Sequence, residues 1–119
     1  MDQDRLIHNY IVQTLKERLS REYKEIRDNV EAEEHQVNGV YPDLILGNHG
    51  LVLAACEVET DRSITPDEAE KWKSIIESGT KLFLMVPSSK TKDVTSLLWE
   101  KGIADKVSLG TYEIKIRMP

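Results

Sequence analysis

The sequence predicts one α/β domain over residues 1–119, with the element order α-β-β-β-α-β-α-β and a mixed sheet flanked by helices. Three observations predict this class. An amphipathic helical pattern opens the chain, a β-rich hairpin pattern occupies residues 41–60, and two later strand patterns each follow a helical one. The length of 119 residues allows a single core, and 39% hydrophobic with 31% charged residues is typical of a globular domain with no membrane span.

The first element is predicted to be a long amphipathic helix from about Asp4 to Asp28. Glu22 falls near the middle of its apolar arc, so a carboxylate faces the core side of the helix. Either Glu22 has a functional role, or the last turns emerge from the core and Glu22 pairs with Arg18 or a lysine. The apolar residues that recur at helical spacing are Leu6, Ile7, Tyr10, Ile11, Leu15, Leu19 and Ile26.

Three successive strands are predicted after this helix. Residues Val30–Val37 resemble a short polar edge strand, and the following Asn38-Gly39 is a strong signal for a two-residue hairpin turn. Two apolar runs, residues 44–46 and 51–58, are then joined by the turn sequence Gly-Asn-His-Gly. The result is an antiparallel meander.

Acidic residues occupy the apolar hairpin at positions where a simple core strand would have none. Glu57 and Glu59 are two residues apart, so both project from the same face of their strand. Asp43, which follows Pro42 on the neighbouring strand, is predicted to lie within reach of Glu57. Three anions in one place repel unless they are protonated, exposed or neutralised by a cation, and Mg²⁺ prefers oxygen ligands of this kind.

The rest of the chain predicts two helices that alternate with two strands. Thr65 is predicted to cap a helix that Gly79 ends, with Pro66 in its first turn, Glu68 completing a capping box and Trp72 as a packing anchor. The apolar run Lys81–Val86 predicts a strand buried on both faces, Ser88–Lys101 a helix, and Val107–Met118 a final strand with one wet face.

Composition and charge limit which cellular compartment and which partners are expected. Cys56 is a single cysteine in an apolar strand, which indicates a buried, inert thiol, and the cytoplasm is the default compartment. The net charge of −5 counts against a nucleic-acid partner, although Mg²⁺ would neutralise part of the acidic cluster. His8, His35 and His49 have no spacing that suggests a zinc site and are expected to be solvated side chains.

The combination of a helix, a meander, Pro42-Asp43, then Glu57-Val58-Glu59 and a further helix resembles the PD-(D/E)XK phosphodiesterase superfamily, which has the restriction-endonuclease-like fold. The resemblance spans nearly the whole chain. It implies a nuclease that hydrolyses DNA with Mg²⁺ or Mn²⁺, in which Asp43 and Glu57 bind the metal and a helix-borne acid at Glu22 completes the site. It also implies a homodimer or a partner protein that supplies DNA recognition.

Glu59 departs from the pattern of the superfamily, which usually has lysine at this position. That lysine is thought to orient or activate the attacking water, and some members carry glutamate instead. In other members a lysine from the following helix takes its place, which makes Lys73, and less strongly Lys71, a candidate catalytic residue beside Asp43, Glu57 and Glu59. The alternative is a non-catalytic module that keeps the fold for protein or nucleic-acid interaction.

Overall fold

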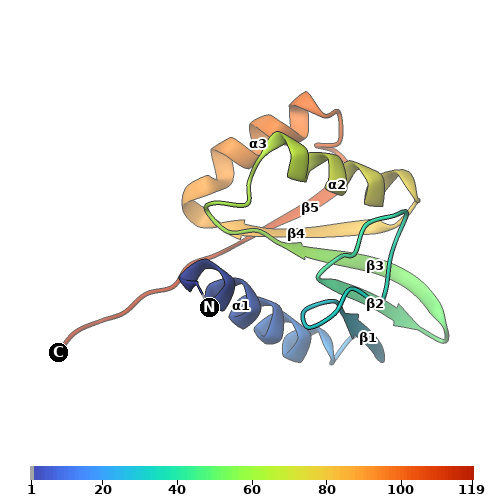
Figure 1. The fold of residues 1–119 in the computed structure, drawn as a ribbon, viewed down its shortest axis with the longest axis horizontal. Coiled ribbons are helices and arrows are strands. Elements are labelled where there is room, and N and C mark those ends of the chain that lie inside the picture. The colour runs from blue at the N-terminus through green and yellow to red at the C-terminus, as the bar shows by residue number, and fades with distance from the viewer. Residues whose placement is uncertain (1) are drawn as a thin grey trace.

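The computed structural model describes residues 2–119, in which five strands form one mixed sheet between helices (Figure 1). The strands lie in the order β1-β2-β3-β4-β5, with α1 on one face of the sheet and α2 and α3 on the other. The predicted α/β class with a mixed sheet is confirmed. The elements are α1 (Gln3–Leu19), β1 (Glu25–Asp28), β2 (Leu44–Asn48), β3 (Leu51–Val58), α2 (Pro66–Glu77), β4 (Lys81–Pro87), the 3₁₀ turn η1 (Ser88–Lys90), α3 (Thr91–Glu100) and β5 (Val107–Tyr112).

The first three strands form the predicted antiparallel meander, and the last two run parallel to β3. The hairpin between β2 and β3 turns at His49 and Gly50, which have φ of 54° and 77°. Strand pairing slips between Leu46 and Gly47, where a bulge breaks the alternation of β3. α2 and α3 provide the crossovers into β4 and β5.

The segment after α1 differs from the sequence prediction. The helix ends at Leu19 rather than Asp28, and residues Glu25–Asp28 form β1, which pairs with β2. Residues 30–37, predicted as a strand, lie instead in a loop that runs to Asp43. The predicted Asn38-Gly39 turn is present in this loop. Val37 and Val40 form an isolated bridge around it, and the φ angles of Asn38 and Gly39 are 49° and 81°.

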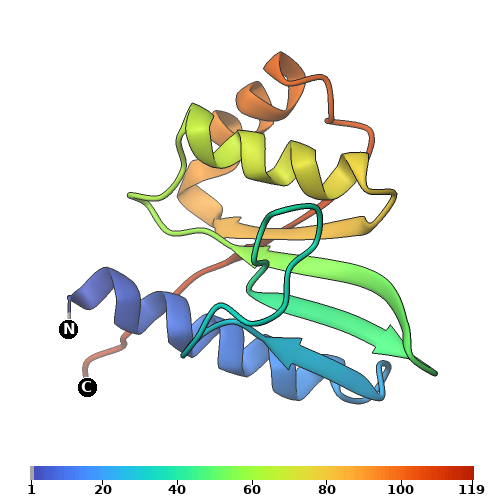
Figure 2. The same ribbon diagram turned by 45° about the vertical axis from the view of Figure 1, so that its right-hand side comes forward.

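Asn29 holds this loop by four hydrogen bonds. Its amide nitrogen donates to the carbonyl oxygens of His35 and Pro42, and its carbonyl oxygen accepts from the backbone N–H groups of Glu34 and His35. A buried or half-buried loop must satisfy its backbone polar groups in this way because it has no ladder partner. The loop therefore has a defined position beside the sheet (Figure 2).

The start of α2 follows the sequence prediction closely. The Thr65 hydroxyl accepts a hydrogen bond from the Glu68 N–H, and Pro66 occupies the first turn. The helix ends before Gly79, whose φ of 84° suits a residue without a side chain. Trp72 is fully buried on the core side, as predicted.

Each face of the sheet has its own hydrophobic core. Ala55, Leu82, Leu84 and Val86 pack under α2 and α3, and their neighbours Ala54, Cys56 and Val58 pack against α1. Leu82, Leu84 and Val86 of β4 are fully buried, whereas Phe83 and Met85 on the α1 side are half-buried. Burial also raises the pKa of the Cys56 thiol, which agrees with its predicted inertness.

The final strand is shorter than predicted, because β5 ends at Tyr112 and residues 113–119 make no ladder. Ile114, Ile116 and Met118 are exposed on this segment rather than packed on the sheet. In the part of the chain that the structure describes, the helices are too short or too polar to cross a membrane.

Candidate metal centre

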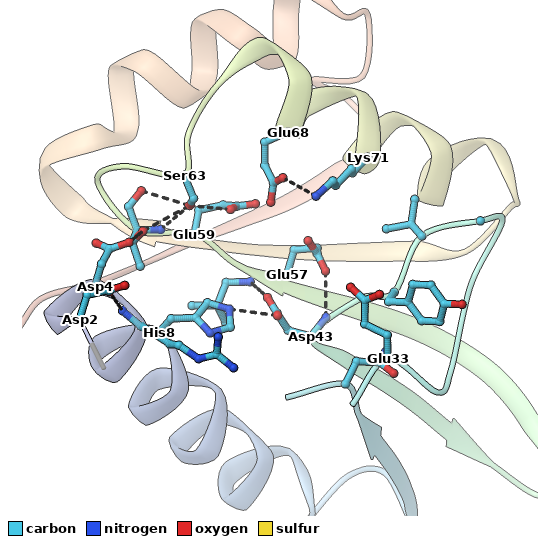
Figure 3. A pocket seen from close by; sticks show the side chains of 17 residues that line it. Asp2, Asp4, His8, Glu33, Asp43, Glu57, Glu59, Ser63, Glu68 and Lys71 are labelled. Carbon is cyan, nitrogen blue, oxygen red and sulfur yellow. Dashed lines mark hydrogen bonds and ion pairs between the residues drawn. The ribbon is translucent and has the colours of Figure 1, made fainter. Parts of the chain in front are cut away.

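A cavity of about 480 Å³ opens beside the ends of β2 and β3 (Figure 3). The start of α1 forms one wall, the loop before β2 forms the opposite wall, and the first turns of α2 lie above it. Seven acidic side chains line the cavity but only two permanently basic ones, Arg5 and Lys71. Acidic groups therefore outnumber basic ones around the cavity.

Three glutamates meet at the centre of this cavity. Glu57 at the end of β3 and Glu59 just beyond it share the α2 face of the sheet, as the spacing of two predicted. Glu68 comes down from the first turn of α2, and one carboxylate oxygen of each glutamate lies within 4.8 Å of the others. Hard divalent cations such as Mg²⁺ and Mn²⁺ prefer such oxygen ligands, so the donor set fits them.

Glu68 was not among the site residues that the sequence predicted. The sequence showed it as the third residue after the cap Thr65, where glutamate commonly returns a hydrogen bond to the cap. The backbone N–H of Glu68 does donate to the Thr65 hydroxyl, but the Glu68 carboxylate contacts Lys71 and approaches Glu57 and Glu59. Only the packing of α2 above the end of β3 brings this carboxylate into the site.

Glu59 is the most constrained of the three glutamates. It is 1% exposed, its Oε1 accepts from the Ser63 hydroxyl at 2.8 Å, and its Oε2 accepts from the Trp72 indole N–H at 2.8 Å. Burial, followed by the charge of Glu68 and a hydrogen bond with it, raises the pKa of Glu59 to about 9. In the absence of a cation, Glu59 is therefore protonated at neutral pH.

Glu57 and Asp43 hold each other through backbone groups. The Asp43 N–H donates to Glu57 Oε1 at 2.9 Å, and the Val58 N–H donates to Asp43 Oδ2 at 2.7 Å. Burial raises the pKa of Glu57 well above its usual range, and the charges of Asp43 and Glu59 add to this. The structure thus brings together the predicted residues Asp43, Glu57 and Glu59.

His8 is a second residue that the sequence prediction missed. Its Nε2 lies 3.0 Å from Asp43 Oδ1, and this hydrogen bond raises the pKa of the imidazole above 6.5. His8 and Arg5 are three residues apart on α1, so both reach the same cavity wall. Its position on a helix 35 residues before Asp43 gave no spacing signal, because the contact depends on how α1 packs on the sheet.

The other two predicted site residues lie outside the cavity. Glu22 is exposed in the turn after α1, since the helix ends at Leu19 and carries no apolar arc through Glu22. Lys73 does not line the cavity, whereas Lys71, the weaker candidate in the sequence, does so and pairs with Glu68 at 3.1 Å. The predicted roles of Glu22 and Lys73 are thus not supported by their positions.

The chain was compared with protein-family models, with curated proteins and with solved structures, and none of the three comparisons gave a match.

Proposed function

We propose that this chain is a nuclease that hydrolyses the phosphodiester backbone of DNA with Mg²⁺ or Mn²⁺. The observation that carries the proposal is the meeting of Glu57, Glu59 and Glu68 within 4.8 Å on the wall of an open cavity. Two of these carboxyl groups are buried, and burial with mutual repulsion opposes their ionisation. A divalent cation would reverse this balance and keep the cluster charged.

The arrangement of elements supports the same proposal. The sheet order β1-β2-β3-β4-β5, with β2 antiparallel to its neighbours and β3, β4 and β5 parallel, is similar to the restriction-endonuclease-like fold. Asp43 precedes β2 and Glu57 ends β3, so the two residues face each other across the hairpin. This is the placement expected of the two metal-binding carboxylates in the PD-(D/E)XK superfamily, to which we propose the chain belongs.

Glu57 and Glu68, with Asp43 beside them, would hold the ion, and a bound cation supplies charge neutralisation at the phosphate and a lower pKa for attacking water. Trp72 and Ser63 fix the Glu59 carboxyl group, so Glu59 serves to orient Glu68 rather than to replace the missing lysine. Lys71 is mostly exposed at the cavity mouth, where its ammonium group can reach a phosphate oxygen.

Cleavage assays with matched variants test this proposal. The purified chain is incubated with plasmid, single-stranded and branched DNA in Mg²⁺ or Mn²⁺, and cation binding is measured by calorimetry. Glu57→Gln and Glu68→Gln should each lower the cleavage rate by about 100-fold or more, because even outer-sphere partners of a metal contribute about 10–100-fold. Glu22→Gln is the control, since Glu22 is exposed outside the cavity.

The two lysines of α2 provide a second matched pair. Lys71→Met should slow cleavage while leaving cation binding intact, and Lys73→Met should do neither, because only Lys71 lines the cavity. Cleavage that persists in Glu57→Gln and Glu68→Gln would place the chemistry elsewhere or reveal a contaminant. Absence of both cleavage and cation binding in the unaltered chain would refute the proposal.

A second function, a non-catalytic interaction module, is favoured by one observation. Both oxygens of Glu59 already bind protein donors, and the raised pKa values of Glu57 and Glu59 allow the cluster to exist as neutral acids. Such a cluster needs no ion. Calorimetry separates the two functions, since the module would bind neither Mg²⁺ nor Mn²⁺.

A further inference from the structure

The free edge of the sheet at β5 continues into an exposed segment. β5 pairs with β4 on one side, and in residues 2–119 its other edge has no strand partner. Residues 113–119 then leave the body of the protein (Figures 1 and 2). An unpaired edge with exposed backbone N–H and C=O groups is a template for pairing with another strand.

The side chains of this segment alternate as they would on a strand with one dry face. Ile114, Ile116 and Met118 are 53%, 85% and 82% exposed, and charged residues separate them. Tyr112 and Gly110 precede them with the same period of two, and Tyr112 packs on the α1 side of the sheet. If the segment continues β5 as a strand, Ile114, Ile116 and Met118 also project from the α1 side of the sheet.

More exposed apolar surface lies on α1. Leu6 and Tyr10 are 54% and 66% exposed, four residues apart on the helix. Between them in sequence, Ile7 lines a groove of about 350 Å³ together with Tyr112 and Ile114. The start of α1 and the first residues of the segment after β5 thus lie side by side at this groove.

The charges of this segment are self-complementary, which indicates that its pairing partner is the same segment of a second copy of the chain. In an antiparallel pair of two copies centred on Ile114, Glu113 of each copy lies opposite Lys115 of the other, and Tyr112 lies opposite Ile116. Centring the pair on Glu113 or on Lys115 would instead place like charges opposite each other, which is unfavourable. A shift of the pairing by one residue would place Ile114 opposite Lys115 in one direction and opposite Glu113 in the other.

We propose that residues 110–118, the end of β5 and the segment after it, form the interface of a homodimer, in which this stretch of each copy pairs with that of the other as antiparallel strands centred on Ile114. A two-fold axis through this residue makes the contact isologous and joins the two sheets into one. Met118 of each copy then lies opposite Gly110 of the other, which has no side chain of its own and packs against the Met85 side chain on the α1 side. This proposal is independent of the proposed nuclease activity.

Charge reversal and rescue test the dimer in the full chain. Light scattering coupled to size-exclusion chromatography should give a dimer for the unaltered protein. Lys115→Glu should raise the dissociation constant of the dimer by about tenfold, because both Glu113–Lys115 pairs become repulsive. Adding Glu113→Lys to the same chain exchanges the charges and should restore the dimer, which a loss of folding could not explain.

Cysteine cross-linking tests the register. Ile114→Cys should form a disulfide-linked dimer under mild oxidation, since directly opposed residues on antiparallel strands have Cα atoms about 4.5–5.5 Å apart. Lys115→Cys should cross-link more slowly because it lies opposite position 113, and Trp99→Cys on α3 is an exposed control outside the interface. A monomeric unaltered protein, failure of the charge exchange to rescue, or faster cross-linking at position 115 would overturn the proposal.

Discussion

Replacing Glu59 with glutamine should change how stability depends on pH. The pKa of the buried Glu59 rises from 4.5 to about 9 on folding, so the folded chain binds a proton more tightly than the unfolded chain over this range. The free energy of unfolding therefore falls as pH rises above about 4.5, at about 1.4 kcal/mol per pH unit. Between pH 4.5 and pH 7, Glu59 alone accounts for a loss of about 3 kcal/mol.

Glutamine resembles the protonated acid in shape and charge. Its carbonyl oxygen can accept from the Trp72 indole as Glu59 does, and its amide can donate toward Glu68 or Ser63. Glu59→Gln should therefore be more stable than the unaltered chain at neutral pH without metal, by up to about 3 kcal/mol. The gain should shrink toward zero as the pH falls to 4.5 and below, because the natural residue then becomes protonated in the unfolded state as well as in the folded state.

Urea unfolding in EDTA from pH 4.5 to pH 8.5, followed by circular dichroism, measures this difference. Because Glu57 is coupled to Glu59, the difference between the two proteins reports the titration of Glu59 together with its effect on Glu57. Glu22→Gln is the control, because Glu22 is exposed in a turn. If Glu59→Gln is no more stable than the unaltered chain at pH 7, or if the difference between the two proteins does not grow with pH, Glu59 is ionised when folded and the reasoning fails.

Three further predictions concern single contacts. The NMR titration midpoint of the His8 imidazole, measured in EDTA, should lie above 6.5 and fall in Asp43→Asn, because the hydrogen bond to Asp43 raises the His8 pKa; an unchanged midpoint would mean that the pair does not form. Gly47→Ala should destabilise the chain by about 1–3 kcal/mol in urea unfolding, because the added Cβ would clash with the Leu51 carbonyl oxygen, and wild-type stability would show that the bulge relaxes freely. Thr65→Ala should cost about 1 kcal/mol by the same measurement through loss of the α2 cap, whereas Thr65→Ser should cost less; equal losses would argue against the cap.

The fold could be predicted where local signals and packing agree. The Thr65-Pro66 start of α2 and the hairpin of β2 and β3 each have turn or cap residues at fixed offsets, and both are confirmed. The segment after Leu19 could not be predicted in this way. Ile26 continues the helical spacing of the apolar residues before it, yet Glu25–Asp28 form β1, because pairing with β2 satisfies their backbone in the sheet.

The residues of the candidate site also differ in whether the sequence could predict them. Glu57 and Glu59 are two residues apart on one strand, so their shared face follows from the strand period alone. Glu68 and His8 reach the cavity from helices, and sequence spacing carries no information about where a helix lies over a sheet. The choice between Lys71 and Lys73 also depended on the rotation of α2, which the burial of Trp72 between them fixes.

The loop that Asn29 holds by four hydrogen bonds forms the wall of the cavity opposite its acidic cluster. The carboxylates are carried by β3 and α2, but the opposite wall, with Glu33, Val40 and Tyr41, belongs to the loop that Asn29 holds. The loop has little backbone pairing of its own beyond the Val37–Val40 bridge. Changes in the part of this loop before Pro42 can therefore alter the width and shape of the entrance, whereas changes at its end would also reach the acidic cluster, because the Asp43 N–H holds the Glu57 carboxyl group.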